Sequence, residues 1–402
     1  MKLKKLFFIM MICIFLNRPI AFAETEKENI FCWEMKDNIS CELEIFSKHC
    51  ICIERTTEQT LFEKDAYSPC AMASTTKILT GIIVIENCNL NDEVIISPNA
   101  ASTGGSTLGI FAGQKITIEN LLYGLLLRSG NDAAVALAEH ISGSVEIFSE
   151  CMNQKAKAIG LKNSHFITPH GLDQEEHYTT AYDLALLTNY ALKNPTFLNI
   201  VGTKQITIQI GNDNRILNNT NELLGIVDGV YGVKTGFTGN AGRCLVTACK
   251  RNDLDIIVVV LGADSKKMRA KDSQKVIEYV FQNFLMVDTE KEIVNSFQSF
   301  QKHKTFEVCK SLNNVEYDYE NVTNYICPID KRKIAKLRTS IYCLEKLDAP
   351  LKQDIIIGKI RLICEDKILY ELNIYLNKKI NRIDWKNYLV IFVKKYITFY
   401  KI

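Results

Sequence analysis

The sequence predicts two domains, a first that mixes helices with strands and a second built mainly of strands. The segment from Ile78 to Ile85 is apolar on nearly every helical face, which indicates a buried helix. The run from Leu254 to Gly262 is continuously apolar, as is typical of a buried strand. From Glu292 onward short β-like runs dominate, and a chain of 402 residues is too long for one average domain.

The first 23 residues are expected to be a cleaved export signal. A basic start is followed by the eleven-residue apolar run Leu6–Leu16 and by the small-residue pattern Ala21-Phe22-Ala23. The run is shorter than the roughly 20 apolar residues that a membrane span needs. Cleavage takes the formal charge from +2 to −2, because it removes four cations, namely Lys2, Lys4, Lys5 and Arg18. Without a basic excess, no nucleic-acid partner is expected.

Cysteines and histidines give no pattern of a metal site. The fourteen cysteines lack zinc-type pairs, so they are expected to be small buried hydrophobes or, in an oxidising compartment, partners in disulfides. His165, His170 and His177 lie within thirteen residues, but their spacing matches neither a helical nor a ribbon-type metal motif. A loop with a structural histidine is the interpretation, and no metal or cofactor is expected.

A possible nucleophile and its base lie at the head of the predicted central helix. Ser74 is expected to open this helix, and Lys77 follows at i+3, so its amine can reach the Ser74 hydroxyl. Burial or a second cation can lower a lysine pKa enough for the amine to act as a base. The same spacing occurs at Ser299 and Lys302, which we interpret as a chance copy, and Ser74 alone could equally be a helix cap.

Two further motifs distinguish the first copy from the second. Ser129-Gly130-Asn131 is predicted in a turn between a helix at 116–127 and a helix at 132–142. Lys234-Thr235-Gly236 precedes the predicted strand at 244–249, at the start of an edge strand or just before it. Gly236 there would let a substrate backbone approach closely, and Thr235 could bind a carboxylate. Each motif alone is weak, but the ordered set is specific.

The ordered set resembles the signature of the penicillin-binding proteins and serine β-lactamases. Residues 40–285 look like a D-Ala-D-Ala carboxypeptidase of that class, and the loop Phe166–Asp173 resembles the one that these enzymes carry opposite the nucleophile. The resemblance implies an α+β fold, in which helices and a helical lobe cover an antiparallel sheet. The stretch 349–360 resembles the small β module of low-molecular-mass penicillin-binding proteins. The expected boundaries are therefore 24–288 for the catalytic domain and 289–380 for the β-rich domain.

The resemblance also implies a role for each site residue. Ser74 would attack the penultimate D-alanine carbonyl, Lys77 would take its proton and Ser129 would relay a proton to the leaving D-alanine. Asn131 would position the substrate and the lysine. The terminal carboxylate would be bound by three side chains, those of Lys234, Thr235 and Arg269. The backbone N–H groups of Ser74 and Phe237 would form the oxyanion hole. Several relatives have histidine in place of Phe237, which bears on substrate preference.

The expected function is thus that of an exported, penicillin-sensitive serine carboxypeptidase, which removes the terminal D-alanine from peptidoglycan stem pentapeptides. β-Lactam antibiotics would be covalent inhibitors. A D,D-endopeptidase on cross-linked peptidoglycan and an inactive penicillin-binding protein share the same motifs. A class A β-lactamase would use a loop glutamate to activate water, and the loop at 163–173 has none.

The C-terminal tail, residues 381–402, is expected to be an amphipathic helix on the outer face of the membrane. One face of this helix is aromatic and apolar, and consists of Trp385, Leu389, Phe392, Tyr396 and Phe399. The lysines lie on the opposite face. The alternative is a helix that docks on its own domain.

Overall fold

The computed structural model describes residues 43–399 apart from 212, 312–314 and 322–324. The expected export signal lies outside these residues. Of the cysteines in the described residues, all eleven are free thiols.

A five-stranded antiparallel sheet organises the first domain, with strand order β2-β1-β9-β8-β7. Its strands are β1 (His49–Glu54), β2 (Thr60–Lys64), β7 (Val230–Thr238), β8 (Gly242–Arg251) and β9 (Leu254–Ala263). The runs predicted at 244–249 and 254–262 lie within β8 and β9. The Lys-Thr-Gly motif lies inside the edge strand β7 and not before it, because residues 230–238 pair with β8 along their length.

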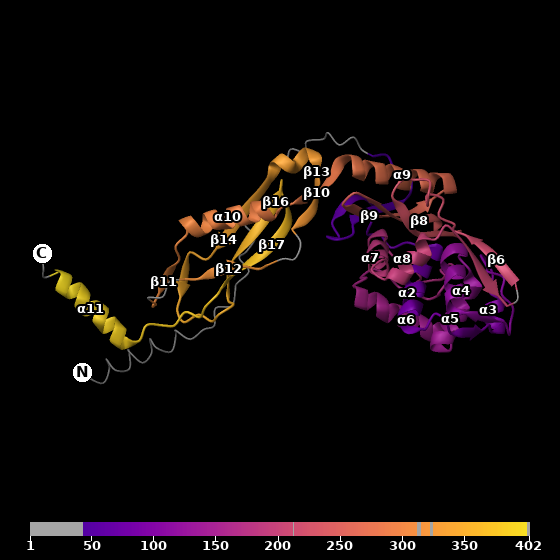
Figure 1. Ribbon diagram of the computed structural model, residues 1–402, viewed down its shortest axis with the longest axis horizontal. Helices are drawn as coiled ribbons and strands as arrows, with labels where there is room; N and C mark the ends of the chain where they lie inside the picture. The colour runs from indigo at the N-terminus through magenta and orange to yellow at the C-terminus, as the bar shows by residue number, and fades with distance from the viewer. Residues whose placement is uncertain (1–42, 212, 312–314, 322–324, 400–402) are drawn as a thin grey trace. The chain divides into compact units, whose positions relative to one another are not determined.

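Helices cover both faces of this sheet, and alternate residues of each strand belong to different cores. On β9, Ile257 and Val259 pack in the larger core, whereas Ile256 and Val258 pack against α9 (Lys266–Asn283). Figure 1 shows α9 on one side of β8 and β9 and the other helices of this domain on the opposite side. Those helices are α2 (Lys77–Asn87), α3 (Pro98–Ala101), α4 (Ile118–Tyr123), α5 (Asn131–Ser142), α6 (Val145–Ile159), α7 (Ala181–Ala191) and α8 (Pro195–Gly202).

The helix predicted at 116–127 is three shorter pieces. Residues Lys115–Thr117 form strand β4, which pairs with β3 (Glu93–Ile95), and Thr117 then caps α4 by accepting from Asn120 N. The final turn, Gly124–Arg128, is π-helical. A second hairpin joins β5 (Gln205–Ile210) to β6 (Asp213–Asn218).

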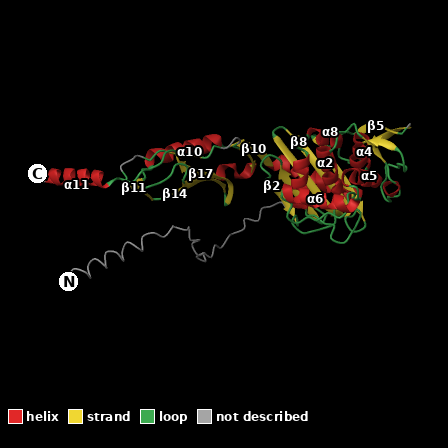
Figure 2. Ribbon diagram, turned by 90° about the horizontal axis from the view of Figure 1, so that it is seen from below, coloured by secondary structure: helices red, strands yellow, loops and turns green. Residues whose placement is uncertain are grey.

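The C-terminal region begins with a helix where only strands were predicted. Helix α10 (Glu290–His303) places Ile293, Phe297 and Phe300 on one face, which packs in the core of the second sheet (Figure 2). That sheet has the order β12-β17-β16-β14. The strands of this region are β10 (Phe284–Asp288), β11 (Glu307–Cys309), β12 (Tyr317–Tyr319), β13 (Ile326–Asp330), β14 (Leu337–Cys343), β15 (Lys346–Asp348), β16 (Ile356–Cys364) and β17 (Lys367–Leu376).

The tail forms helix α11 (Trp385–Phe399), as predicted. Its described apolar side chains are largely exposed, with Trp385 at 70%, Leu389 at 58% and Phe392 at 64%. Among the described residues, no helix has both the length and the apolar character required to traverse a bilayer.

Candidate active site

Ser74, the candidate nucleophile, lies in the turn that precedes helix α2 and does not open the helix itself. Ser74 is in a 3₁₀ turn, Ala73–Thr76, and the α-helix begins at Lys77. Two threonines tighten this turn: Thr75 Oγ1 donates to Met72 O at 2.6 Å, and Thr76 Oγ1 donates to Ala73 O at 2.8 Å. Ala73 itself has φ 51°, a conformation that non-glycine residues rarely adopt. The tight turn keeps the i+3 spacing and leaves Ser74 lining a pocket.

Lys77 is buried and lies against three oxygen acceptors. Its Nζ is 2.8 Å from Ser74 Oγ, 2.7 Å from Asn131 Oδ1 and 2.7 Å from His170 O. Burial lowers the Lys77 pKa well below its usual value, and the positive charge of Lys234 lowers it further. The amine therefore has access to its neutral form.

The neighbours of Lys77 determine where the lone pair of the neutral amine points. The His170 carbonyl only accepts, and the amide of Asn131 presents its oxygen because its Nδ2 donates to Gly104 O at 2.8 Å. Neutral Lys77 has two N–H groups, which these two oxygens engage. Its lone pair then faces the Ser74 hydroxyl, which is the arrangement that a general base needs.

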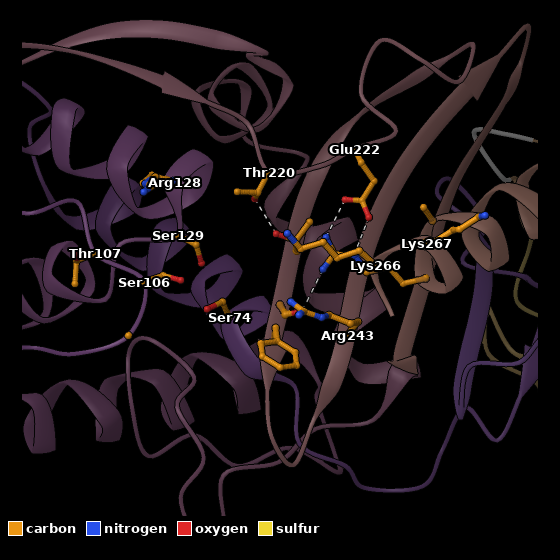
Figure 3. Close-up of a pocket in the computed structure, with 16 residues that line it drawn as sticks. Ser74, Ser106, Thr107, Arg128, Ser129, Thr220, Glu222, Arg243, Lys266 and Lys267 are labelled. Carbon is orange, nitrogen blue, oxygen red and sulfur yellow. Dashed lines mark hydrogen bonds and ion pairs between the residues drawn. The ribbon is translucent and has the colours of Figure 1, made fainter. Parts of the chain in front are cut away.

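The second motif enters the same pocket from the start of α5. Ser129 has φ 68° at the end of the π-helical turn, and Asn131 opens α5. Buried Asp132 ties the start of α5 to the segment at 108–109, because its carboxylate accepts from Leu108 N at 2.8 Å and from Gly109 N at 2.7 Å. Figure 3 shows the hydroxyls of Ser74 and Ser129 close together at one side of the pocket.

The third motif faces Ser74 from the edge strand β7. Lys234 is buried, and burial together with the charge of Arg269 lowers its pKa to about 7. Thr235 Oγ1 lies 2.7 Å from Thr220 Oγ1 at the pocket wall. A Cβ on Gly236 would lie 3.1 Å from Met72 O and 3.2 Å from Ser74 N, so glycine lets β7 approach the nucleophile turn. The next residue, Phe237, is 53% exposed.

Arg269 lines the pocket but has its donors engaged. Its Nε and Nη2 each donate to Glu222 at 2.8 Å, and its Nη1 donates to Gly236 O and Cys244 O, both at 3.3 Å. The predicted direct contact with a substrate carboxylate is therefore available to at most one remaining N–H. The positive charge of Arg269 still lowers the pKa of Lys234.

The loop predicted to lie opposite the nucleophile packs directly on its turn. A Cβ on Gly171, at φ 85°, would lie 1.9 Å from Ala73 O. His177 Nε2 is 2.9 Å from Thr76 Oγ1, and its Nδ1 accepts from Ile167 N at 2.9 Å. Burial lowers the pKa of His177 to about 4, so the ring is neutral. Within the described residues, the histidines join no cluster suited to a metal ion.

The three motifs thus surround one pocket of about 630 Å³. Several lining or supporting residues carry no local sequence signal and escape prediction, namely Thr76, Asp132, Thr220, Glu222 and Arg243. The chance copy of the Ser-x-x-Lys spacing is not part of this pocket, because Ser299 and Lys302 lie on α10 of the second domain.

A sheet covered by helices, with a Ser–Lys pair facing its edge strand, is the architecture of the penicillin-binding serine peptidases. The family model for peptidase S11, described as D-alanyl-D-alanine carboxypeptidase, matches residues 36–265. The chain belongs to this family.

Individual relatives agree with the family model. The chain is 39% identical over 249 residues to D-alanyl-D-alanine carboxypeptidase DacF of Bacillus subtilis, a match that spans 60% of this chain and 64% of the relative. It therefore spans just under two thirds of that relative's length. It is 30% identical to the enzyme DacA of Haemophilus influenzae, over 72% of this chain and 73% of the relative.

Solved structures extend the likeness into the C-terminal region. The crystal structure of the D-alanyl-D-alanine carboxypeptidase DacD from Francisella tularensis has a TM-score of 0.71 at 27% identity, and covers 85% of this chain and 95% of its own. Penicillin binding protein 5 from Haemophilus influenzae has the same TM-score and identity, over 84% of this chain and 98% of its own. The chain therefore has the expected α+β fold.

Proposed function

We propose that the chain is a serine D-alanyl-D-alanine carboxypeptidase, which removes the terminal D-alanine from peptidoglycan stem pentapeptides through an acyl-enzyme. The observation that carries this proposal is the position of Lys77 Nζ, which lies within 2.8 Å of the Ser74 hydroxyl and is held by two further acceptors. The names of the relatives support the substrate class.

In the acylation step, Lys77 takes the hydroxyl proton as Ser74 Oγ bonds to the carbonyl carbon of the penultimate D-alanine. The carbonyl oxygen becomes an oxyanion, which the N–H groups of Ser74 and Phe237 stabilise. The closeness of Gly236 to Ser74 N supports this pairing of donors from the turn and from β7. The C–N bond then breaks, and a proton passes through Ser129 to the departing amine.

In the second step, water attacks the ester carbonyl and gives its proton to the same lysine. The acyl–oxygen bond breaks, Ser74 recovers its proton and the shortened peptide leaves. Asn131 holds Lys77 in the orientation that both steps need. A β-lactam amide would acylate Ser74 in the same way, but its leaving amine stays tethered.

The terminal carboxylate of the substrate would be bound at β7 by Lys234 and Thr235. Thr235 lines the pocket next to Ser74, and the neighbouring Lys234 supplies a positive charge from a buried position. We assign Arg269 an indirect part, since Glu222 engages its donors and its charge acts on Lys234.

We further propose that residues 1–23 direct export and that α11 attaches the enzyme to the outer face of the membrane. The exposed apolar side chains of α11 support such an attachment. The catalytic domain would extend over residues 24–288 and the β-rich domain over 289–380. The hydrophobic clusters support a boundary close to this one, because each of them is confined to residues up to 286 or to residues from 287 onward.

The test is release of D-alanine from a pentapeptide ending in D-Ala-D-Ala, compared with cleavage of a cross-linked dimer. We expect the pentapeptide to be the better substrate. Faster cleavage of the dimer would replace the carboxypeptidase assignment with that of a D,D-endopeptidase. Absence of both reactions, with intact penicillin labelling, would identify a penicillin-binding protein without peptidase activity.

A further inference from the structure

Glu222 is the one acidic residue among the described residues that line the catalytic pocket, and the proposed reaction gives it no part. Its two oxygens accept from Nε and Nη2 of Arg269, both at 2.8 Å, so the pair is bidentate. The Arg269 side chain is 5% exposed and that of Glu222 is 31% exposed. Glu222 therefore covers one edge of a buried guanidinium on the side of the pocket.

The other edge of the Arg269 guanidinium is held by the sheet. Its Nη1 donates to Gly236 O on β7 and to Cys244 O on β8, both at 3.3 Å. These contacts keep the group within one residue of Thr235, where the terminal carboxylate of the substrate lies under the proposed function. A guanidinium binds a carboxylate best through two parallel N–H groups. Glu222 already occupies the edge that could make such a pair.

The turn that presents Glu222 is held by its own backbone and by two asparagines. Asn219 Oδ1 accepts from Asn221 N at 2.9 Å, and Asn221 Oδ1 accepts from Leu223 N at 3.1 Å. Buried Asn221 also donates from Nδ2 to Gly232 O on β7 at 2.7 Å. The Glu222 side chain takes no part in these bonds, so a substitution there should leave the turn in place.

The same turn also reaches the expected position of the substrate carboxylate. Thr220 Oγ1 lies 2.7 Å from Thr235 Oγ1, and Figure 3 shows Thr220 and Glu222 on the same side of Ser74. Both residues of the turn line the pocket together with Thr235. A substrate carboxylate at Thr235 and the Glu222 carboxylate would therefore compete for the guanidinium of Arg269.

We propose that Glu222 is a specificity-determining residue, which withholds Arg269 from the substrate and leaves the terminal carboxylate to Lys234 and Thr235. The inference rests on the proposed function and deepens it. The two cations differ in their response to pH, because Lys234 loses its proton as pH rises through its pKa of about 7, whereas a guanidinium stays charged. The preference for a free carboxylate should thus decline in alkaline solution, and should persist there once Arg269 is released.

The experiment measures kcat/KM for a pentapeptide ending in D-Ala-D-Ala and for its C-terminal amide, at pH 6 and at pH 9. In the wild type the acid-to-amide ratio should fall toward one at pH 9, because Lys234 is neutral and Glu222 engages Arg269. In Glu222→Gln the ratio at pH 9 should be roughly 10-fold above that of the wild type, since glutamine has no charge and one acceptor oxygen in place of two. A ratio equal to that of the wild type would overturn the inference.

The double variant Glu222→Gln/Arg269→Lys separates a released guanidinium from a simple loss of negative charge. Lysine keeps a positive charge near Lys234 but lacks the planar pair of N–H groups. The ratio at pH 9 should return to the wild-type value, and a gain that persists in this variant would overturn the inference. The matched control is Glu278→Gln, which removes the bidentate partner of Arg251 from α9 outside the pocket and should leave the ratio unchanged.

Arg269→Lys alone tests the inference with Glu222 intact, and so decides it even where Glu222→Gln is unstable. The acid-to-amide ratio at pH 6 should stay at the wild-type value, because the substrate does not pair with the guanidinium. A roughly 10-fold fall would show that the substrate already binds Arg269 beside Glu222, which contradicts the inference. No D-alanine release by the wild type from either peptide would instead overturn the proposed function, and the role of Glu222 with it.

Discussion

At the scale of single residues, the proposed chemistry depends on two buried lysines, Lys77 and Lys234. Lys77 and Lys234 each lose solvation on folding, and the charge of Lys234 lowers the pKa of Lys77. Their neighbours differ: Lys77 faces Ser74, whereas the Nζ of Lys234 donates to Thr235 O at 3.0 Å. One lysine is therefore suited to take a proton and the other to attract an anion.

The first prediction concerns acylation. A fluorescent penicillin should label the wild-type protein, and Ser74→Ala should abolish the label because the nucleophile is gone. Lys77→Ala should slow labelling by roughly 10²–10⁴-fold, the usual contribution of a general base. The matched control is Ser299→Ala, which changes the chance copy on α10 and should label normally. Labelling that survives in Ser74→Ala and disappears in Ser299→Ala would reverse the assignment.

The second prediction concerns the charge of Lys234 and the terminal carboxylate. Amidation of the terminal D-alanine should lower kcat/KM by roughly 10–100-fold at pH 6, because it removes charge-assisted hydrogen bonds. The pKa of Lys234 is about 7, so the side chain loses its proton and its charge as pH rises through that value. The advantage of the acid over the amide should therefore decrease above pH 7. The check is the acid-to-amide ratio of kcat/KM from pH 5.5 to 9, and a ratio constant over that range would contradict the role of Lys234.

At the scale of elements, the nucleophile turn is supported by the loop that carries His177. The loop contributes His170 O to Lys77 and the His177 ring to Thr76. Since Nδ1 of His177 accepts from the backbone, a protonated ring would lose that bond and repel the N–H group. The turn and the loop should therefore come apart in acid.

The third prediction follows from this loop. The pKa of His177 is lowered from 6.5 to about 4, because burial disfavours the imidazolium. Between these pH values the unfolded chain binds a proton that the folded chain does not, so the free energy of unfolding rises with pH across this window. The contribution, roughly 3 kcal/mol, is complete above pH 6.5 and is lost as pH falls toward 4.

Urea denaturation between pH 4 and 6.5 measures this slope. We expect His177→Gln to reduce this slope without abolishing it, because burial also lowers the pKa of His170, to about 3. His140→Gln, a change at an exposed histidine on α5, should leave the slope as in the wild type. Identical slopes in the wild type and His177→Gln would show that the ring does not couple protonation to folding.

At the scale of the whole molecule, the fourth prediction concerns the tail. Deleting Ile383–Ile402 should leave kcat/KM unchanged, since no site residue lies there, and should abolish sedimentation with anionic lipid vesicles. Burial of one large apolar side chain contributes about 1.5–3 kcal/mol, so several exposed residues of α11 suffice for binding. The check compares mature full-length and truncated protein in a vesicle pull-down. Full-length protein that stays in the supernatant would contradict membrane attachment.

The sequence predicted several elements of the first domain but misjudged others whose form depends on packing. A continuous apolar run identified β9, because a strand that is buried on both faces carries apolar side chains at successive positions. Helix α10 was missed, although Ile293, Phe297 and Phe300 have helical spacing, because the β-like runs after it dominated the interpretation.

The sequence by itself identified the candidate catalytic set, since Ser-x-x-Lys, Ser-x-Asn and Lys-Thr-Gly are short motifs whose chemistry depends on residue type and local spacing. Only the tertiary structure decided which distant residues position these side chains and which charges lie beside them. Glu222 engages Arg269 across 47 residues, His177 reaches Thr76 across 101, and Arg243 stacks on Phe237 through strand pairing. Such contacts have no local period or spacing in the chain, because they arise when distant segments pack together.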